Sequence, residues 1–330
     1  MSPSSSITRY LDRSLPFSRN PRESEIRILV PIVRAQAAET LIAVGDALAK
    51  PKDADGKVLG LVEVPRNPER NMNAQITSRR RDLLRWIANQ ERVASTSGRL
   101  GILVRVVHSV PLGIREAVLE TGTNLLVLEW PGPESQRAGT LSSVLDDLSS
   151  QPPADLVLVR PPQKSLQPSA HRLRIAVPIR GGANARLALR VGAALAAAWS
   201  GDLYLIHMIN PNDHPDRRAN ELDQSRAAAA GVSPAMLVEH EAIDIDRAIA
   251  SVAEAADVVL LGAQAAKSRH PELVRAELAS ALSSYDRLLI VVRSAQPDKE
   301  ADGEGDRGAV SRPAEPADLS GRKAAAEPNG

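Results

Sequence analysis

Two segments in the second part of the sequence bring glycine and positive charge together. Their members are Arg180, Gly181, Gly182, Gly262, Lys267, Arg269 and His270. Backbone N–H groups at glycines and cationic side chains both attract phosphates and other anions. We therefore expect these residues to hold an anionic ligand by charge. A solvated basic loop is the more common outcome for such a charge run, and this alternative stays open.

A weaker glycine pattern lies in the first part of the sequence, at Gly132, Gly139 and Thr140. A Gly-Thr pair that opens a helix can hold a phosphate at the helix N-terminus. Here the carboxylate of Glu129 would repel an anion, and the prolines on both sides of Gly132 remove amide donors. We therefore favour a plain helix start at Gly139-Thr140 over phosphate binding.

The remaining candidates for catalysis or metal binding have simpler explanations. His108 and Ser109 are neighbours at a strand end, so their side chains point apart and form no catalytic dyad; Ser109 instead indicates a helix start. His207 lies within an apolar strand, where we expect it to be buried. The segment 210–216 contains Asp-His-Asp among Pro and Asn residues, which favours a turn over a metal site. The arginines at 79–81 are expected on a solvated helix face.

Composition excludes several classes of protein. The 330 residues include no cysteine, 41 Lys and Arg against 40 Asp and Glu, and 2% aromatic residues. There is accordingly no disulfide framework or thiol chemistry, no basic excess for nucleic acid and little base-stacking surface. No apolar run approaches the roughly 18–20 residues that span a bilayer, and the N-terminus lacks a secretory pattern. We expect a cytoplasmic protein that is not itself a membrane protein.

Three apolar segments occur twice, in the same order. The pairs are RILVPIV (27–33) with RIAVPIR (174–180), NLLVLEW (124–130) with DVVLLGA (257–263), and DLVLVRP (155–161) with RLLIVVR (287–293). Such ordered recurrence indicates an internal repeat.

The order of elements in each repeat predicts the fold class. Short, continuously apolar runs are typical of strands covered on both faces, and amphipathic helical periods lie between them. We therefore predict two tandem α/β domains, each with a doubly wound, parallel, Rossmann-like sheet. Ligands of such sheets bind at the carboxyl ends of the strands. The loops expected there are 33–36, 129–140, 180–184 and 262–270.

Composition also sets the boundaries. Residues 1–22 and 296–330 are polar and lack periodicity, which predicts disordered tails. Residues 161–171 contain three prolines and no apolar pattern, which predicts a linker. The domains then cover 23–160 and 172–295.

Each domain resembles a universal stress protein. The resemblance is carried by the paired strand segments and by the LLVLEW-x-G…GT stretch. The segments VLGLVEVPR (58–66) and VVHSVPLGIREAVLETGTNLLVL (106–128) are similar to tandem stress-protein domains that form the cytoplasmic tails of amino acid permeases. The family implies an adenine nucleotide alpha hydrolase-like fold and association of the two domains through their last strands, as an internal pseudo-dimer. A further homodimer stays open.

The motif of the nucleotide-binding family members is incomplete in both copies. That motif is Gly-x-x-Gly, about nine residues, then Gly-Ser/Thr, with an Asp after the first strand. Glu129 and Val33 occupy the first glycine and the Asp position in the first domain. In the second, Ala265 replaces the second glycine, Arg180 the Asp, and Arg275 the final glycine.

These observations predict a non-catalytic sensing or regulatory module of the stress response, with an amino acid transporter as the candidate partner. ATP or another adenine nucleotide is the candidate anionic ligand, with no cofactor certain. No catalytic residue, metal site or nucleic-acid partner is assigned. The alternative is an ATP-binding protein with weak ATPase or nucleotide transferase activity.

Overall fold

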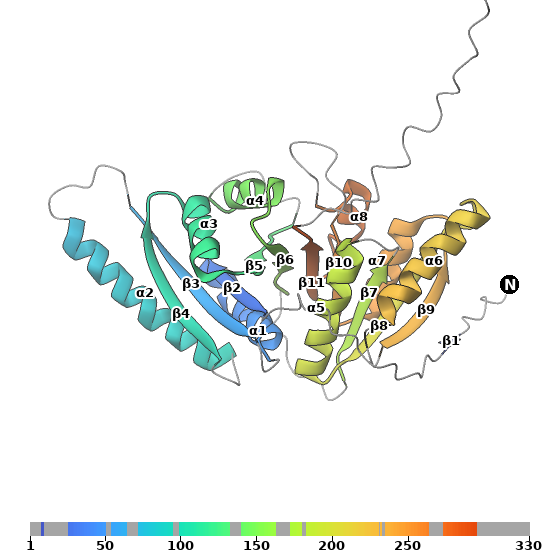
Figure 1. The fold of residues 1–330 in the computed structure, drawn as a ribbon, viewed down its shortest axis with the longest axis horizontal. Helices are drawn as coiled ribbons and strands as arrows, with labels where there is room; N and C mark the ends of the chain where they lie inside the picture. Colours follow the sequence, from blue (N-terminus) through green and yellow to red (C-terminus); the bar gives the residue numbers. More distant parts are fainter. Residues whose placement is uncertain are drawn as a thin grey trace, which may run out of the picture. The chain divides into compact units, whose positions relative to one another are not determined.

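Strands and helices alternate along the chain (Figure 1). The computed structural model describes residues 8–9, 26–50, 54–64, 72–94, 99–132, 140–162, 172–179, 183–230, 232, 235–263 and 273–295. All of these lie in one compact unit, Met1–Pro297. In this described part of the chain no helix has the length and hydropathy needed to cross a membrane.

The first half of the fold contains five strands and their connecting helices. They are β2 (Arg27–Ile32), the 3-10 turn η1 (Ala35–Ala37), α1 (Ala38–Leu48), β3 (Asp55–Glu63), α2 (Met72–Ala94), β4 (Leu100–Val107), α3 (Val110–Thr121), β5 (Leu125–Glu129), α4 (Thr140–Ser150) and β6 (Asp155–Arg160). The strands coincide with the apolar runs of the sequence, and α4 begins at the predicted Thr140.

The second half repeats this series. Its elements are β7 (Arg174–Ile179), α5 (Ala183–Trp199), β8 (Asp202–Ile209), α6 (Pro215–Ala229), β9 (Ala235–Glu241), α7 (Ile245–Ala255), β10 (Val258–Gly262), α8 (Ala276–Ala281) and β11 (Leu288–Arg293). Strands β7 to β11 therefore correspond in order to β2 to β6, as the internal sequence repeat predicts.

One sheet runs through both halves. The strand order is β6-β5-β2-β3-β4 in the first half and β11-β10-β7-β8-β9 in the second, with parallel pairing inside each. The predicted contact of the last strands is present, because β6 and β11 pair antiparallel and join the halves. A short strand, β1 (Thr8–Arg9), adds to the edge of β9, within the segment predicted as a tail.

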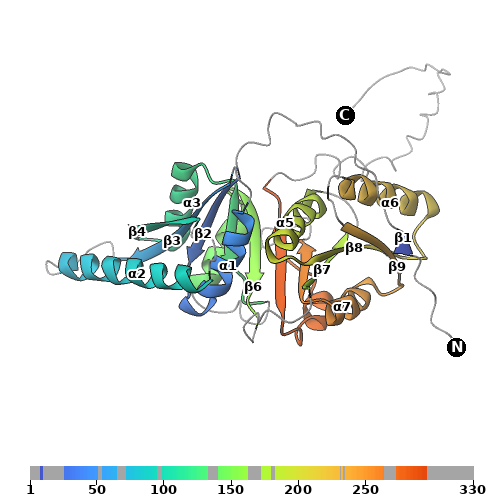
Figure 2. The same ribbon diagram turned by 90° about the horizontal axis from the view of Figure 1, so that it is seen from below.

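Two apolar layers cover the sheet, one on each face. The layer containing Val30, Val58 and Ile290 packs against α1, α2 and α5 (Figure 2). The layer containing Leu29, Leu59 and Leu289 packs against α3, α4, α7 and α8. Both faces of the strands are therefore buried, which explains their continuous apolarity.

Local signals define the helix that follows β4. Ser109 has the extended backbone of an N-cap and a proline lies in the first turn, as predicted, although the Ser109 side chain makes no capping hydrogen bond. The helix ends at Gly122, whose φ of 62° is the left-handed conformation that favours glycine. The C-cap of α3 thus has the expected glycine geometry with backbone hydrogen bonds, whereas the N-cap lacks its side-chain hydrogen bond.

Candidate functional site

The strand order reverses once in each half, and we use the word crevice for the carboxyl ends of the two strands on either side of each reversal. In the first half, β2 lies between β3 and β5: the chain continues from β2 to β3 and β4 on one side and then returns to β5 on the other. In the second half, β7 lies in the same way between β8 and β10. Doubly wound sheets bind ligands at such points of reversal. The residues that follow β2, β5, β7 and β10 therefore decide what each half can hold.

An ion pair occupies the crevice of the first half. Glu129, the last residue of β5, is 4% exposed, and Arg34 follows β2. The Nε atom of Arg34 donates to both carboxylate oxygens of Glu129, at 3.0 and 2.9 Å, and its Nη2 atom also contacts Oε1. The hydrogen bond to Glu129 raises the pKa of the Arg34 guanidinium. This forked pair places a carboxylate where a phosphate would have to lie.

Sequence reasoning recognised Glu129 as unfavourable for an anion but missed its partner. Arg34 stands directly after Val33, the residue that matches the family's Asp position. A basic residue after the first strand, together with an acid after the fourth, is the signal that could have revealed the pair. These two strand ends are adjacent wherever β2 and β5 pair, as they do here.

Of the two glycines predicted in the first half, only Gly132 lies in the described part of the chain. Gly132 has a φ of 90°, and a Cβ atom at this position would lie 3.7 Å from Cδ of Arg160. Gly139 lies outside the described residues, and of Thr140 only the backbone, which begins α4, is described. Leu141, Val144, Leu145 and Leu148 of α4 are buried, as a plain helix start predicts.

An asparagine makes two backbone contacts at the crevice of the second half. Asn184, in the first turn of α5, donates from Nδ2 to the carbonyl oxygen of Ala263 at 2.7 Å and accepts from the Ser294 amide at 2.7 Å. A Cβ atom at Gly262 would lie 3.1 Å from Cβ of Asn184. A side chain at position 262 would therefore require the start of α5 to shift by a few tenths of an ångström. The other predicted ligand residues, Arg180, Gly181, Gly182, Lys267, Arg269 and His270, lie outside the described residues.

Two histidines considered in the sequence, His108 and His207, each lie within hydrogen-bonding distance of a residue in the same half. His207 is 2% exposed, as predicted, and its Nδ1 atom lies 2.9 Å from Oγ of Ser225 on α6. Nδ1 of His108 lies 3.1 Å from the carbonyl oxygen of Val64. The described residues contain no group of three His, Asp or Glu side chains that could hold a metal ion.

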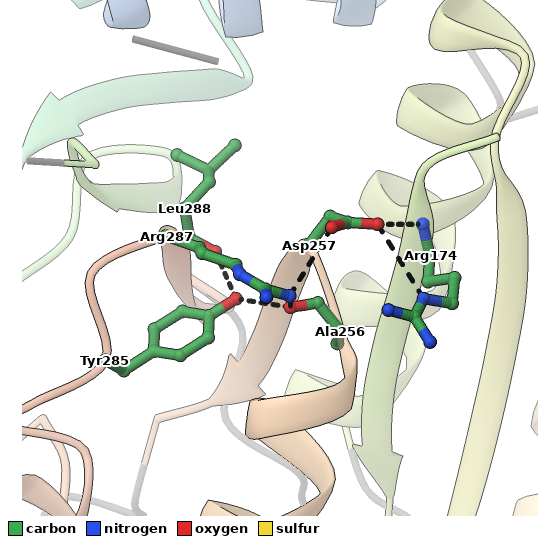
Figure 3. Close-up of polar contacts among 6 residues, drawn as sticks. All are labelled: Arg174, Ala256, Asp257, Tyr285, Arg287 and Leu288. Atoms are coloured by element: carbon green, nitrogen blue, oxygen red, sulfur yellow. Dashed lines mark hydrogen bonds and ion pairs between the residues drawn. The ribbon is translucent and has the colours of Figure 1, made fainter. Parts of the chain in front are cut away.

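A polar cluster at the opposite end of the second-half sheet fastens three strands together (Figure 3). Asp257, which precedes β10, accepts from the Arg174 amide at 2.8 Å, and its other oxygen lies 3.4 Å from Nη1 of Arg287. Arg287 also donates to the carbonyl of Ala256, toward which the Tyr285 hydroxyl points. Burial raises the pKa of Tyr285. Because these groups are hydrogen-bonded to one another, we assign the cluster a structural role in holding β7, β10 and β11 together.

Solved structures share the architecture. A universal stress protein from Archaeoglobus fulgidus DSM 4304 matches with a TM-score of 0.54 and 14% identity, over 84% of this chain and 98% of that chain. This chain has the universal stress protein fold. The cytoplasmic domain of a prokaryotic cation chloride cotransporter matches with a TM-score of 0.53 and 12% identity, over 82% and 96% of the two chains.

These matches confirm the resemblance at the level of the fold. No family model and no curated protein matches the sequence. Within the universal stress protein fold, the two crevices described above are where the nucleotide motif would lie. In this chain, Arg34 with Glu129 and Asn184 with Ala263 make internal contacts there.

Proposed function

We propose that the protein is a non-catalytic regulatory module with the universal stress protein fold. The observation that carries this proposal is the ion pair of Arg34 with Glu129 in the crevice of the first half. Phosphoryl chemistry needs positive groups directed at the phosphates and a positioned water or base. Here the arginine is engaged by a buried carboxylate, which supports a binding or scaffolding role over ATP turnover.

The likeness to the cytoplasmic domain of a cotransporter supports a transporter as partner. On this proposal the protein acts on the cytoplasmic side of a membrane and alters the rate of an amino acid permease. Uptake of labelled amino acids should change when the protein is removed from cells, at unchanged permease abundance. Unchanged uptake across a full panel of amino acids would contradict the transporter role.

Calorimetry with ATP and Mg²⁺ tests the non-catalytic role. We expect no binding in the low-micromolar range and no phosphate release above the blank, because Glu129 repels the phosphates and occupies Arg34. Glu129→Gln removes the charge at nearly constant shape and serves as the matched variant. Nucleotide binding that appears only in Glu129→Gln would support closure of the crevice by the pair. Micromolar binding with turnover by the wild-type chain would overturn the proposal.

A further inference from the structure

The outer face of α2 is basic. This helix covers β3 and β4 at the edge of the first-half sheet, and Ile76, Leu83 and Ile87 form the side that packs against the core (Figure 2). It contains five arginines against two acids, and all five are exposed, including the three predicted on a solvated face: Arg79, Arg80, Arg81, Arg85 and Arg92. None of the sites described above uses these side chains.

Three of these arginines are aligned along the helix. Arg81, Arg85 and Arg92 are four and then seven residues apart, so their side chains lie within about 40° of one another around the axis. We call these three residues the basic stripe, and it is about 16 Å long. Apolar side chains are exposed on either side of it: Leu84 is 37% and Val93 is 72% exposed.

The acids of α2 compensate little of this positive charge. Asp82 is exposed, and its carboxylate lies 3.7 Å from Nη1 of Arg85. Glu91 is partly buried, and the charge that acts on it is that of Asp46 on α1. The arginines at 79–81 have no ion pair with another residue in the described part of the chain. The outer face of α2 therefore keeps a net positive charge.

The second half contains an internal control for this surface. α6 takes the place of α2 in the repeat, but it has three arginines and three acids. Nε of Arg217 lies 3.1 Å from Oε1 of Glu221, and Nη2 of Arg226 lies 3.5 Å from Oε1 of Glu239. The same place in the fold is thus filled by a helix with balanced charge, so the basic face of α2 is not a requirement of packing.

The composition of this face indicates the class of its partner. A base-stacking surface for single-stranded nucleic acid is lacking, because Trp86, the one aromatic residue of α2, packs against the core. An acidic protein would need carboxylates spaced to match the basic stripe, whereas a layer of lipid headgroups offers phosphates at any spacing. Exposed apolar side chains beside arginines, such as Leu84, suit the boundary between headgroups and acyl chains. These features favour a membrane surface.

We propose that the outer face of α2 binds the surface of a membrane that contains anionic phospholipids. The basic stripe contacts the headgroup phosphates, and Leu84 lies beside it among the headgroups. The contact is peripheral, because the apolar side of α2 stays packed against the core. This inference rests on the proposed function only for its purpose, which is to hold the module at the membrane of its transporter. Failure of the transporter role would leave binding to protein-free vesicles unchanged.

Co-sedimentation of the full chain with vesicles tests the proposal. The wild type should bind vesicles of phosphatidylcholine with phosphatidylglycerol, should not bind phosphatidylcholine alone, and should be released as salt screens the charges. Arg81→Gln with Arg85→Gln should lower the affinity about 25-fold, because each arginine near an anionic surface contributes about fivefold. Arg217→Gln with Arg226→Gln is the matched control. It removes the same charge from exposed positions of α6 and should bind as the wild type does.

Further variants keep the proposal decidable. If the α2 double variant does not fold, Arg92→Gln alone should still lose about fivefold in affinity. Arg81→Lys with Arg85→Lys keeps the charge and should retain binding to the anionic vesicles. Equal losses in the α2 and α6 double variants would show an effect of net charge and would overturn the site. Binding to poly-glutamate but not to anionic vesicles would also overturn it, and would identify an acidic polypeptide as the partner.

Discussion

The energetic effect of a charged side chain in this protein depends on how deeply it is buried and on whether an opposite charge lies beside it. Glu129 is nearly inaccessible and is held by Arg34, whereas Arg293 is buried with no counter-charge among the described residues. Glu91 on α2 is a milder case. Burial, and then the negative charge of Asp46 on α1, raise the pKa of its carboxyl group.

The raised pKa of Glu91 gives a pH-dependent prediction. Because the folded state holds the proton more tightly than the unfolded state, ionised Glu91 lowers stability above its folded pKa, and this penalty disappears as pH falls below its unfolded pKa. Glu91→Gln should therefore stabilise the protein at about pH 7, by less than about 1 kcal/mol, because the side chain is partly solvated. Near pH 4 the gain should shrink toward zero.

Urea unfolding at the two pH values measures this difference. Glu116→Gln, at an exposed glutamate of α3, is the control and should change stability little at either pH. A gain for Glu91→Gln that is equally large in acid would show that the charge is not its cause.

Helix ends show how the elements are joined. The end of α4 is held by Arg115 from α3, and the end of α8 by Arg160 from β6. The first contact lies within one half, and the second connects the two halves. Equivalent helices of the repeat thus use different arginines for the same physical task.

Arg160 should accordingly contribute more to stability than other charged contacts between the halves. Arg160→Met removes two hydrogen bonds to carbonyls and the contact with the Tyr285 ring, and should lower the free energy of unfolding by about 1–3 kcal/mol. Urea unfolding provides the measurement. Arg190→Met, which breaks an exposed ion pair with Asp155, should cost less than about 1 kcal/mol. If the two variants lost the same free energy of unfolding, the contacts of Arg160 with the end of α8 would not stabilise the protein more than an exposed ion pair does.

At the scale of the whole molecule, local patterns predicted the architecture well. The apolar runs at 27–33 and 155–161 became β2 and β6, and the duplicated order of segments became two halves with the same strand order. The pairing of β6 with β11 followed from the family resemblance. These features depend on hydrophobic periodicity, which is visible within a few residues of sequence.

The polar contacts of the site could not be predicted from local sequence patterns. Arg34 meets Glu129 across 95 positions of sequence, and Arg160 meets Leu282 across 122. Which charges meet depends on strand order and side-chain rotamer, neither of which a local motif contains. The anion site predicted at Arg180, Lys267, Arg269 and His270 lies outside the described residues and stays a prediction.

The antiparallel joint between β6 and β11 has a consequence for how this chain can change. In a symmetric pair of identical chains, every substitution appears twice, so a residue that suits one copy is imposed on the other. Here both partners are written in one gene at separate positions, and each side can be altered alone. Glu129 at the end of β5 and Gly262 at the end of β10 show such a difference: an ion pair lies at one crevice, and a glycine at the other. The two halves of one chain can therefore carry different residues at equivalent positions, which a symmetric pair of identical chains cannot.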